Sequence, residues 1–241
     1  SAREANGSHH LKASMGSDLL FEATLTPKKQ VVLNGEKGVS FKDEGEASRY
    51  FSYTRMELEG DLTVDGSVEH LTGLAWMDRE FGTWAPTERQ KGWDWFSIQF
   101  NDQTELMCYQ LRDSKNKISP FSSGVFVDKD GTTTRLSAYQ IFIEPTGKWL
   151  SPGSGATYPS GWVVSVPSLG ISANVQPVMK DQELDTRGTT MIVYWEGDCT
   201  VDATIGNRPV TGRSYVELVG YDRSHESPNL AAFLLGNRFG Q

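Results

Sequence analysis

The sequence predicts an all-β protein, and three observations support this prediction. The chain of 241 residues contains 24 glycines and 10 prolines, which separate short stretches of alternating apolar and polar residues. Turn-forming pairs such as Asp65-Gly66 stand between these stretches. No segment of a dozen residues has a clear period of 3.6, and only 229–235 is compatible with a short helix. Many short antiparallel strands at regular spacing indicate a sandwich or a barrel.

Charge and composition argue against several classes of protein. The net charge is −8 and the sequence has no run of Lys or Arg, so the electrostatic footprint of nucleic-acid binding is absent. No stretch approaches the roughly 20 apolar residues that a membrane span requires. We therefore expect no nucleic-acid partner and no membrane span. The compartment stays open between the cytoplasm and export with the signal removed, because the chain starts at Ser1 rather than Met.

The first strong hairpin joins residues 49–60 to residues 70–82. Asp65-Gly66 is the preferred pair for a two-residue type I′ turn, so Val64 should lie opposite Ser67. Both faces of this hairpin are expected to be buried, as in a barrel wall covered on the outside. The same register predicts three cross-strand pairs on one face: Arg55 with Trp76, Tyr53 with Asp78, and Phe51 with Glu80.

The second hairpin joins residues 92–100 to residues 105–112 around a turn at 101–104. An Arg112 side chain opposite Trp93 would allow a cation–π contact. A register centred on the turn predicts these cross-strand pairs: Phe96 with Tyr109, Asp94 with Leu111, Trp95 with Gln110, and Trp93 with Arg112.

Carboxyl groups stand among aromatic residues in both hairpins. The predicted register places Asp94 among apolar side chains, where loss of water raises the pKa of a carboxyl group. A carboxylic acid that keeps its proton near neutral pH can act as a general acid. Asp78 and Glu80 would anchor or protonate a ligand from the first hairpin. The structural alternative is that Asp94 pairs with Arg79 or Arg55, and that Arg55 neutralises the other two acids.

The aromatic residues allow two interpretations as well. Trp76, Trp93, Trp95 and Tyr109 either line a ligand cavity or belong to the core. Trp195 belongs to a further aromatic set in the second half of the chain, with the same two interpretations.

Other kinds of site are not expected. The sequence has no phosphate-binding glycine loop and no nucleophile elbow. His9 and His10 are adjacent, but nothing supplies further ligands at zinc spacing, so no metal site is predicted. Cys108 and Cys199 lie in strand-like segments and are expected to be small buried thiols, with a disulfide as the alternative.

Three ordered motifs give the chain a family resemblance. They are residues 73–82 (GLAWMDREFG), 92–99 (GWDWFSIQ) and 105–112 (ELMCYQLR). With them, and with weaker matches up to residue 221, the sequence resembles the AttH/CrtC lipocalin-like family from about residue 19 onward.

The resemblance implies a fold of lipocalin-like antiparallel β-barrels or sandwiches, with two β domains packed together and a pocket in or between them. Residues 1–88 would then be the remainder of an N-terminal lipocalin-like domain, incomplete because family members are longer. Residues 89–241 would form the C-terminal lipocalin-like β-barrel domain.

The functions implied by the resemblance diverge. Carotenoid 1,2-hydratases add water to a terminal polyene double bond without a cofactor, fungal pericyclases catalyse Diels–Alder cyclisation, and other members are known only as secreted or transport-associated proteins. The first interpretation is therefore a cofactor-independent enzyme that hydrates or cyclises a polyene, terpenoid or polyketide-like substrate. The alternative is a non-catalytic lipocalin-like carrier of a hydrophobic small molecule. The oligomeric state stays open.

On the enzyme interpretation, the catalytic candidates are Asp94, Asp78 and Glu80. Arg79 stands where many hydratase-like members carry His, and this difference weighs against a hydratase proton relay. The residues expected to bind the substrate are Tyr53, Arg55, Trp76, Trp93, Trp95, Tyr109 and Trp195.

Overall fold

The computed structural model describes residues 2–3, 7–82, 90–189 and 192–222. Its strands pair in antiparallel fashion. The helical segments in the described ranges are two short 3₁₀ turns, η1 (Ala138–Gln140) and η2 (Pro167–Leu169). This confirms the predicted all-β class. Within the described residues, no helix has the length and hydropathy needed to cross a membrane.

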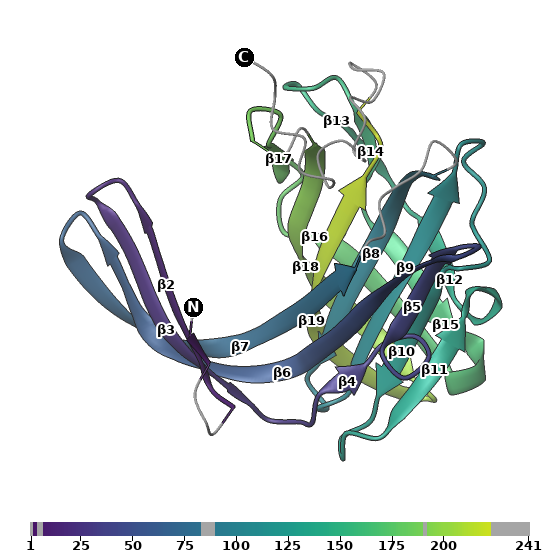
Figure 1. Ribbon diagram of the computed structural model, residues 1–241, viewed down its shortest axis with the longest axis horizontal. Coiled ribbons are helices and arrows are strands. Elements are labelled where there is room, and N and C mark those ends of the chain that lie inside the picture. Colours follow the sequence, from purple (N-terminus) through teal and green to yellow (C-terminus); the bar gives the residue numbers. More distant parts are fainter. Residues whose placement is uncertain (1, 4–6, 83–89, 190–191, 223–241) are drawn as a thin grey trace.

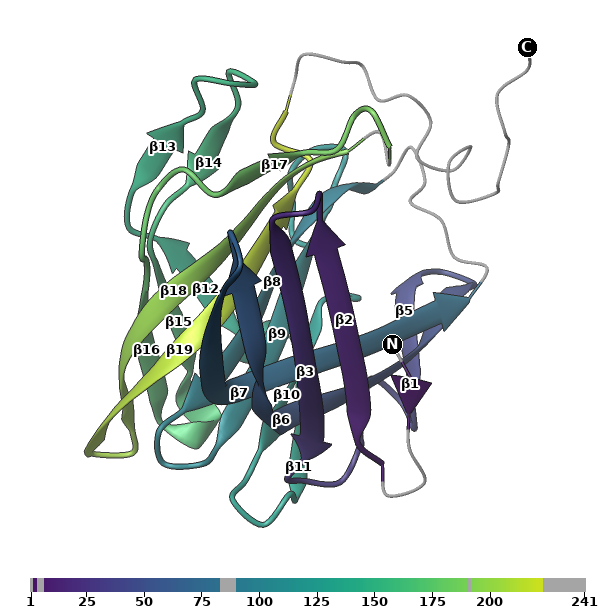
Figure 2. The same cartoon turned by 90° about the vertical axis from the view of Figure 1, so that its left-hand side faces the viewer.

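The first sheet is built around β6 (Glu46–Val64) and β7 (Ser67–Gly82), two long strands joined by the Asp65-Gly66 turn. In Figure 1 these strands run across the lower part of the second sheet, and their turn end projects from it together with β2 and β3. Figure 2 shows the projecting strands from the side, in front of the second sheet. The other strands of this sheet are β1 (Ala2–Arg3), β2 (His9–Met15), β3 (Leu19–Pro27), β4 (Val32–Leu33) and β5 (Val39–Asp43).

The second sheet curls into a half-barrel with the strand order β11-β10-β9-β8-β19-β18-β16-β15-β12. β17 (Glu183–Asp185) pairs with β18 outside this path, and β13 (Lys148–Leu150) pairs with β14 (Thr157–Pro159) in a small separate ribbon. The strands on the path are β8 (Gln90–Phe100), β9 (Glu105–Asp113), β10 (Ser123–Val127), β11 (Thr133–Ser137), β12 (Phe142–Pro145), β15 (Trp162–Val166), β16 (Ile171–Pro177), β18 (Val193–Ile205) and β19 (Arg208–Val219).

Strands β8 and β9 are covered on both faces, and this position creates the site. Their inner face, with Phe96, Ile98 and Cys108, belongs to the core of the half-barrel. Their outer face, with Tyr109 and Leu111, packs with residues of the first sheet in a second apolar cluster. A charged cluster also joins the sheets, because the fully buried Glu105 of β9 binds both Lys29 and Arg55.

The first hairpin begins in the predicted register and then leaves it. Asp65 and Gly66 both have positive φ, and Val64 pairs with Ser67, as a type I′ turn requires. Between Tyr53 and Met56 the register shifts by one residue, since β6 uses two residues where β7 uses only Trp76. The predicted pairs beyond this β-bulge are wrong: the structure pairs Tyr53 with Met77, Ser52 with Asp78, Phe51 with Arg79 and Tyr50 with Glu80.

The second hairpin is also shifted by one residue from the prediction. Its loop has three residues rather than a symmetric pair, with Gln103 at φ 70° and its N–H bonded to the Phe100 carbonyl. The predicted contact of Arg112 with Trp93 is therefore wrong, and the guanidinium lies over the ring of Tyr221 instead, 4.1 Å from its centroid. The observed cross-strand pairs are Trp93 with Leu111, Asp94 with Gln110, Trp95 with Tyr109 and Phe96 with Cys108.

The predicted domain boundary and the predicted C-terminal helix cannot be compared with the described residues. The two sheets are formed by residues 2–82 and 90–219, but the predicted domain boundary at 88/89 and the short helix at 229–235 lie outside the described residues. The division into two domains stays a prediction. Cys108 and Cys199 are both buried and free, and burial raises the pKa of each thiol to about 12, which confirms the prediction of buried thiols.

Candidate functional site

A cavity of about 900 Å³ lies between β7 of the first sheet and strands β8, β9, β18 and β19 of the second. Cavities of this volume are large enough for drug-sized ligands. Trp76 and Trp95 form part of the wall, where their rings meet edge to face at 6.3 Å. The apolar side chains of the wall are Leu74, Trp76, Trp93, Trp95, Tyr109 and Leu111.

Asp78 is held by three neutral donors. Its Oδ1 accepts hydrogen bonds from Ser52 Oγ at 2.5 Å and Trp76 Nε1 at 2.7 Å, and its Oδ2 accepts one from the Tyr50 hydroxyl at 2.5 Å. Loss of bulk water raises the pKa of the Asp78 carboxyl, while the three donors act in the opposite direction. The bulge in β6 makes this arrangement possible, because it turns Tyr50 and Ser52 to the face of Asp78.

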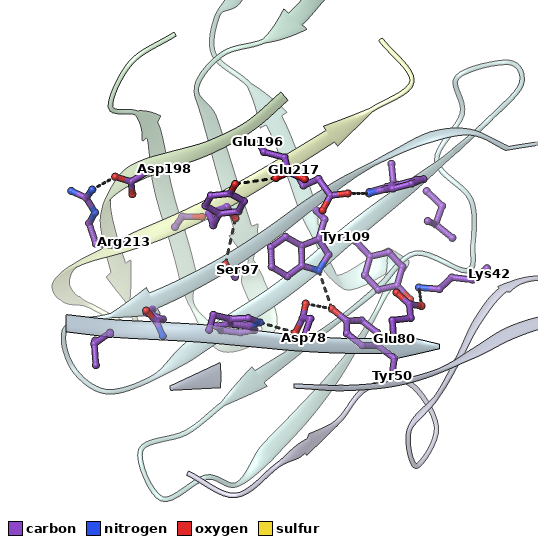
Figure 3. A pocket seen from close by; sticks show the side chains of 18 of the residues that line it. Lys42, Tyr50, Asp78, Glu80, Ser97, Tyr109, Glu196, Asp198, Arg213 and Glu217 are labelled. Atoms are coloured by element: carbon purple, nitrogen blue, oxygen red, sulfur yellow. Dashed lines mark hydrogen bonds and ion pairs between the residues drawn. The ribbon is translucent and has the colours of Figure 1, made fainter. Parts of the chain in front are cut away.

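The Tyr50 hydroxyl links the two sheets. It donates to Asp78 on β7 and accepts a hydrogen bond of 3.1 Å from Trp95 Nε1 on β8 (Figure 3). Burial and the nearby Asp78 raise the pKa of Tyr50 well above its ordinary value, so this phenol keeps its proton. The Trp95–Tyr50–Asp78 chain therefore has a fixed direction of donation.

At one corner of the cavity, Glu80 forms an ion pair with Lys42 of β5. Lys42 Nζ lies 2.8 Å from Glu80 Oε1, and the side chain of Lys42 is only 6% exposed. The same Nζ lies 4.5 Å from the ring centroid of Tyr109, which is a cation–π distance. Ser48 Oγ also donates to Glu80.

Glu217 of β19 is a carboxyl group in the cavity wall whose pKa lies near neutral pH. Its Oε1 accepts a 2.6 Å hydrogen bond from Trp93 Nε1. Burial raises the pKa of Glu217 to about 7, and the charges of Glu196, Asp78 and Glu80 act in the same direction, against the Trp93 hydrogen bond. Near neutral pH this group can therefore both give and take a proton.

The far wall consists of further paired polar groups on β18 and β19. Glu196 lies directly opposite Glu217 in the strand pairing, and its Oε2 accepts a 3.1 Å hydrogen bond from the Tyr215 hydroxyl. Asp198 forms an ion pair with Arg213. Figure 3 shows these groups on the side of the cavity opposite Asp78.

The structure brings together six of the ten residues that the sequence suggested for the site. All six belong to β7, β8 or β9 and line the cavity: Asp78, Glu80, Trp76, Trp93, Trp95 and Tyr109. The alternation of side chains along β7 and β8 accounts for this grouping, because it was correct within each strand even where the cross-strand register was not.

Asp94 lies elsewhere. It points to the opposite face of β8, where Arg112 Nε lies 3.2 Å away and the Tyr221 hydroxyl donates to both carboxyl oxygens, at 3.0 and 2.9 Å. Burial raises the pKa of Asp94, and Arg112 acts in the opposite direction. The ion pair resembles the structural alternative, but its partner is Arg112 rather than Arg79 or Arg55. A second cavity, of about 590 Å³, is lined in part by Asp94.

Three predicted substrate-binding residues also lie away from the cavity. Tyr53 is turned from it by the bulge and packs edge to face on His9 and Phe51. Arg55 is bound to Glu105. Trp195 is buried in the half-barrel core, where its Nε1 donates to the Lys180 carbonyl at 2.8 Å.

Sequence reasoning missed Lys42, Tyr50 and Glu217 as site residues, and it named Glu196 only within the aromatic set of the second half of the chain. A signal existed for the acids, because polar residues alternate with buried apolar ones along β18 and β19. Alternation alone does not distinguish a face that lines a cavity from one that meets bulk solvent. For Tyr50 the missing information was the bulge, which no motif in the sequence announces.

The carboxyl groups are not arranged as a metal centre. Across the ranges that the structure describes, no cluster of three or more His, Cys, Asp or Glu side chains is arranged to hold a metal ion. The chemistry that the described residues themselves offer is proton transfer and hydrogen bonding inside an aromatic cavity.

Comparison with known proteins gives consistent results. The model of the AttH-like family matches residues 1–221. The crystal structure of an AttH-type protein from Nitrosomonas europaea is similar, with 32% identity, a TM-score of 0.82, and coverage of 91% of this chain and 67% of that one. Kievitone hydratase from Nectria haematococca has 21% identity, a TM-score of 0.72, and coverage of 90% of this chain and 69% of that one. Among the curated proteins none matches this chain.

Proposed function

We propose, because the chain belongs to the AttH-like family, that it is a hydratase-like enzyme which adds water to an apolar small molecule in the cavity between the two sheets. The substrate would be a polyene, terpenoid or polyketide-like compound with an electron-rich double bond. The observation that carries the proposal is Glu217, a carboxyl group with a pKa raised to about 7 in the wall of an aromatic cavity. The fold similarity to kievitone hydratase supplies the reaction class to be tested first.

The proton steps can be assigned to named groups. Protonated Glu217 would give its proton to one alkene carbon, and positive charge would develop on the other carbon. The faces of Trp93, Trp95 and Trp76 would stabilise that charge, as aromatic faces do for cations. A water molecule would then bond to this carbon and lose a proton to the Glu217 carboxylate, so that the acid is restored and one water is consumed.

Asp78 has a supporting role in this scheme. Three donors already occupy its oxygens, so its carboxylate is held in one orientation. Its negative charge favours the cationic transition state electrostatically and also helps to keep Glu217 protonated. Glu80, which is neutralised by Lys42, would contribute less.

The test is incubation of the protein with kievitone and a panel of terpenoid and polyene alkenes in heavy-oxygen water, followed by mass spectrometry. Addition of one labelled water, lost in Glu217→Gln, is expected. Glu57→Gln is the matched control, because Glu57 is an exposed acid of β6 that pairs with Lys28 outside the cavity. A product of unchanged mass but altered retention would indicate cyclisation instead. A ligand that binds and is recovered unchanged would indicate a carrier and contradict the proposal.

A further inference from the structure

The charged residues around the cavity are unbalanced. Among the described residues, five carboxyl groups and two cationic groups line it, and the cationic groups are Lys42 and Arg213. The acids are Asp78, Glu80, Glu196, Asp198 and Glu217.

Both cationic groups are already paired with acids. Lys42 lies 2.8 Å from Glu80 and against the ring of Tyr109. Arg213 forms its ion pair with Asp198. A ligand anion would therefore have to displace a carboxylate before it could reach either positive charge.

The other three acids have neutral partners only, among the described residues. Asp78 accepts from Tyr50, Ser52 and Trp76, Glu217 accepts from Trp93, and Glu196 accepts from Tyr215. Neutral donors satisfy hydrogen-bond geometry but leave the net charge in place. The described residues of the cavity consequently carry an excess of negative charge.

The aromatic wall favours the same kind of ligand. Its aromatic faces attract cations and repel anions, because the face of a π system is negative.

We propose that this cavity selects apolar ligands whose polar group is an uncharged hydroxyl or a cationic amine, and that it rejects carboxylates, phosphates and sulfates of the same size. This inference rests on the proposed function and narrows its substrate class. The donor on the ligand would bind to the oxygens of Glu196, Glu217 or Asp78, and the apolar body would lie against the tryptophans.

The test compares three saturated ligands of equal chain length, decylamine, decanol and decanoate, by isothermal titration calorimetry at pH 8. The amine and the alcohol are expected to bind at least about tenfold more tightly than the carboxylate, which corresponds to one unfavourable charge contact at intermediate dielectric. Decanoate binding as tightly as decanol, or more tightly, would overturn the inference.

Variants connect the selectivity to the named acids. In Glu217→Gln, and further in Glu217→Gln with Asp78→Asn, the preference for decylamine over decanoate should fall several-fold. Glu57→Gln removes the same charge from an exposed position outside the cavity and should leave the preference unchanged. If the single variant and the control behave alike, the acids of the cavity do not select the ligand.

The outcome is separable from that of the proposed function. Saturated chains cannot be hydrated, so their binding reports on charge selection alone. Selection without water addition to any alkene would leave this inference standing and contradict the hydratase proposal. If the protein added water to an alkene carboxylate as efficiently as to the corresponding alcohol, the hydratase proposal would stand and this inference would be contradicted.

Discussion

The indole N–H of Trp93 donates a hydrogen bond of 2.6 Å to Oε1 of Glu217, across the pairing of β8 with β19. This bond fixes one oxygen of a carboxyl group whose pKa is raised to about 7. The bond favours the ionised form, whereas burial and the neighbouring acids favour the protonated form. The protonation of Glu217 is thus set by burial and three neighbouring carboxylates acting against one tryptophan hydrogen bond.

Replacement of that tryptophan should shift the balance. In Trp93→Phe the donor is lost while an aromatic ring remains, so the pKa of Glu217 should rise further above 7. The limb of the pH–rate profile that reports the acid should move to higher pH, by about half a unit to one unit. Trp149→Phe is the control, since Trp149 stacks on Tyr158 away from the cavity. An unchanged profile in Trp93→Phe would show that this bond does not control the acid.

The raised pKa of Glu217 also predicts a pH-dependent stability. Between about pH 4.5 and pH 7 the folded state holds a proton that the unfolded chain releases, so stability conferred at low pH is lost as the pH rises through this window. Glu217→Gln should therefore be more stable than the parent at pH 8, by about 1–3 kcal/mol, and nearly equal to it at pH 4. Urea denaturation at the two pH values measures this difference. Equal stability differences at both values would contradict the raised pKa.

Asp94→Asn tests the acid that the sequence placed first among the catalytic candidates. The substitution leaves the guanidinium of Arg112 buried without its countercharge, and this should cost about 3 kcal/mol of folding stability. Because Asp94 lies on the opposite face of β8 from the cavity, turnover of folded protein should stay within about twofold. Urea unfolding and water addition, measured on the same preparation, separate the two effects. Loss of turnover with folding intact would establish Asp94 as the acid after all.

The buried Glu105 should be among the most sensitive acids to neutralisation. Its side chain is 0% exposed and binds Lys29 Nζ at 2.8 Å and Arg55 Nε, so Glu105→Gln leaves two buried cations uncompensated. A loss of about 3–5 kcal/mol is expected in denaturant unfolding. Glu57→Gln, which breaks an exposed pair with Lys28, should change stability by less than about 0.5 kcal/mol. Similar losses in the two variants would mean that burial does not govern the Glu105 contact.

The sequence was informative where a rule acts within one strand. The Asp65-Gly66 turn, the alternation that places Trp76 with Asp78 and Glu80, and the adjacent indoles of β8 all follow from short-range patterns. These patterns were enough to predict the all-β class and six of the residues that line the cavity.

The rest depended on which strands meet and in which register. A one-residue bulge in the first hairpin and a three-residue loop in the second each shift the cross-strand pairs by one residue from the prediction. Neither feature has a distinctive residue pattern. Asp94 is buried, but beside Arg112 and Tyr221 rather than among apolar side chains, because β8 is covered on both faces and Asp94 lies on the face away from the cavity. Glu217 is more than a hundred residues from Trp93 in the chain, so their contact arises only from the pairing of β19 with β8.

The extra residue in β6 has a consequence for how such a protein can diversify. If Thr54 and Arg55 each paired with a residue of β7 in place of sharing Trp76, Tyr53 would lie opposite Asp78 and Phe51 opposite Glu80, and Tyr50 and Ser52 would move to the other face. The bulge therefore determines which side chains of β6 surround Asp78. Relatives that share this scaffold could acquire a different chemistry through a change of register at this point, without any replacement of the acid itself.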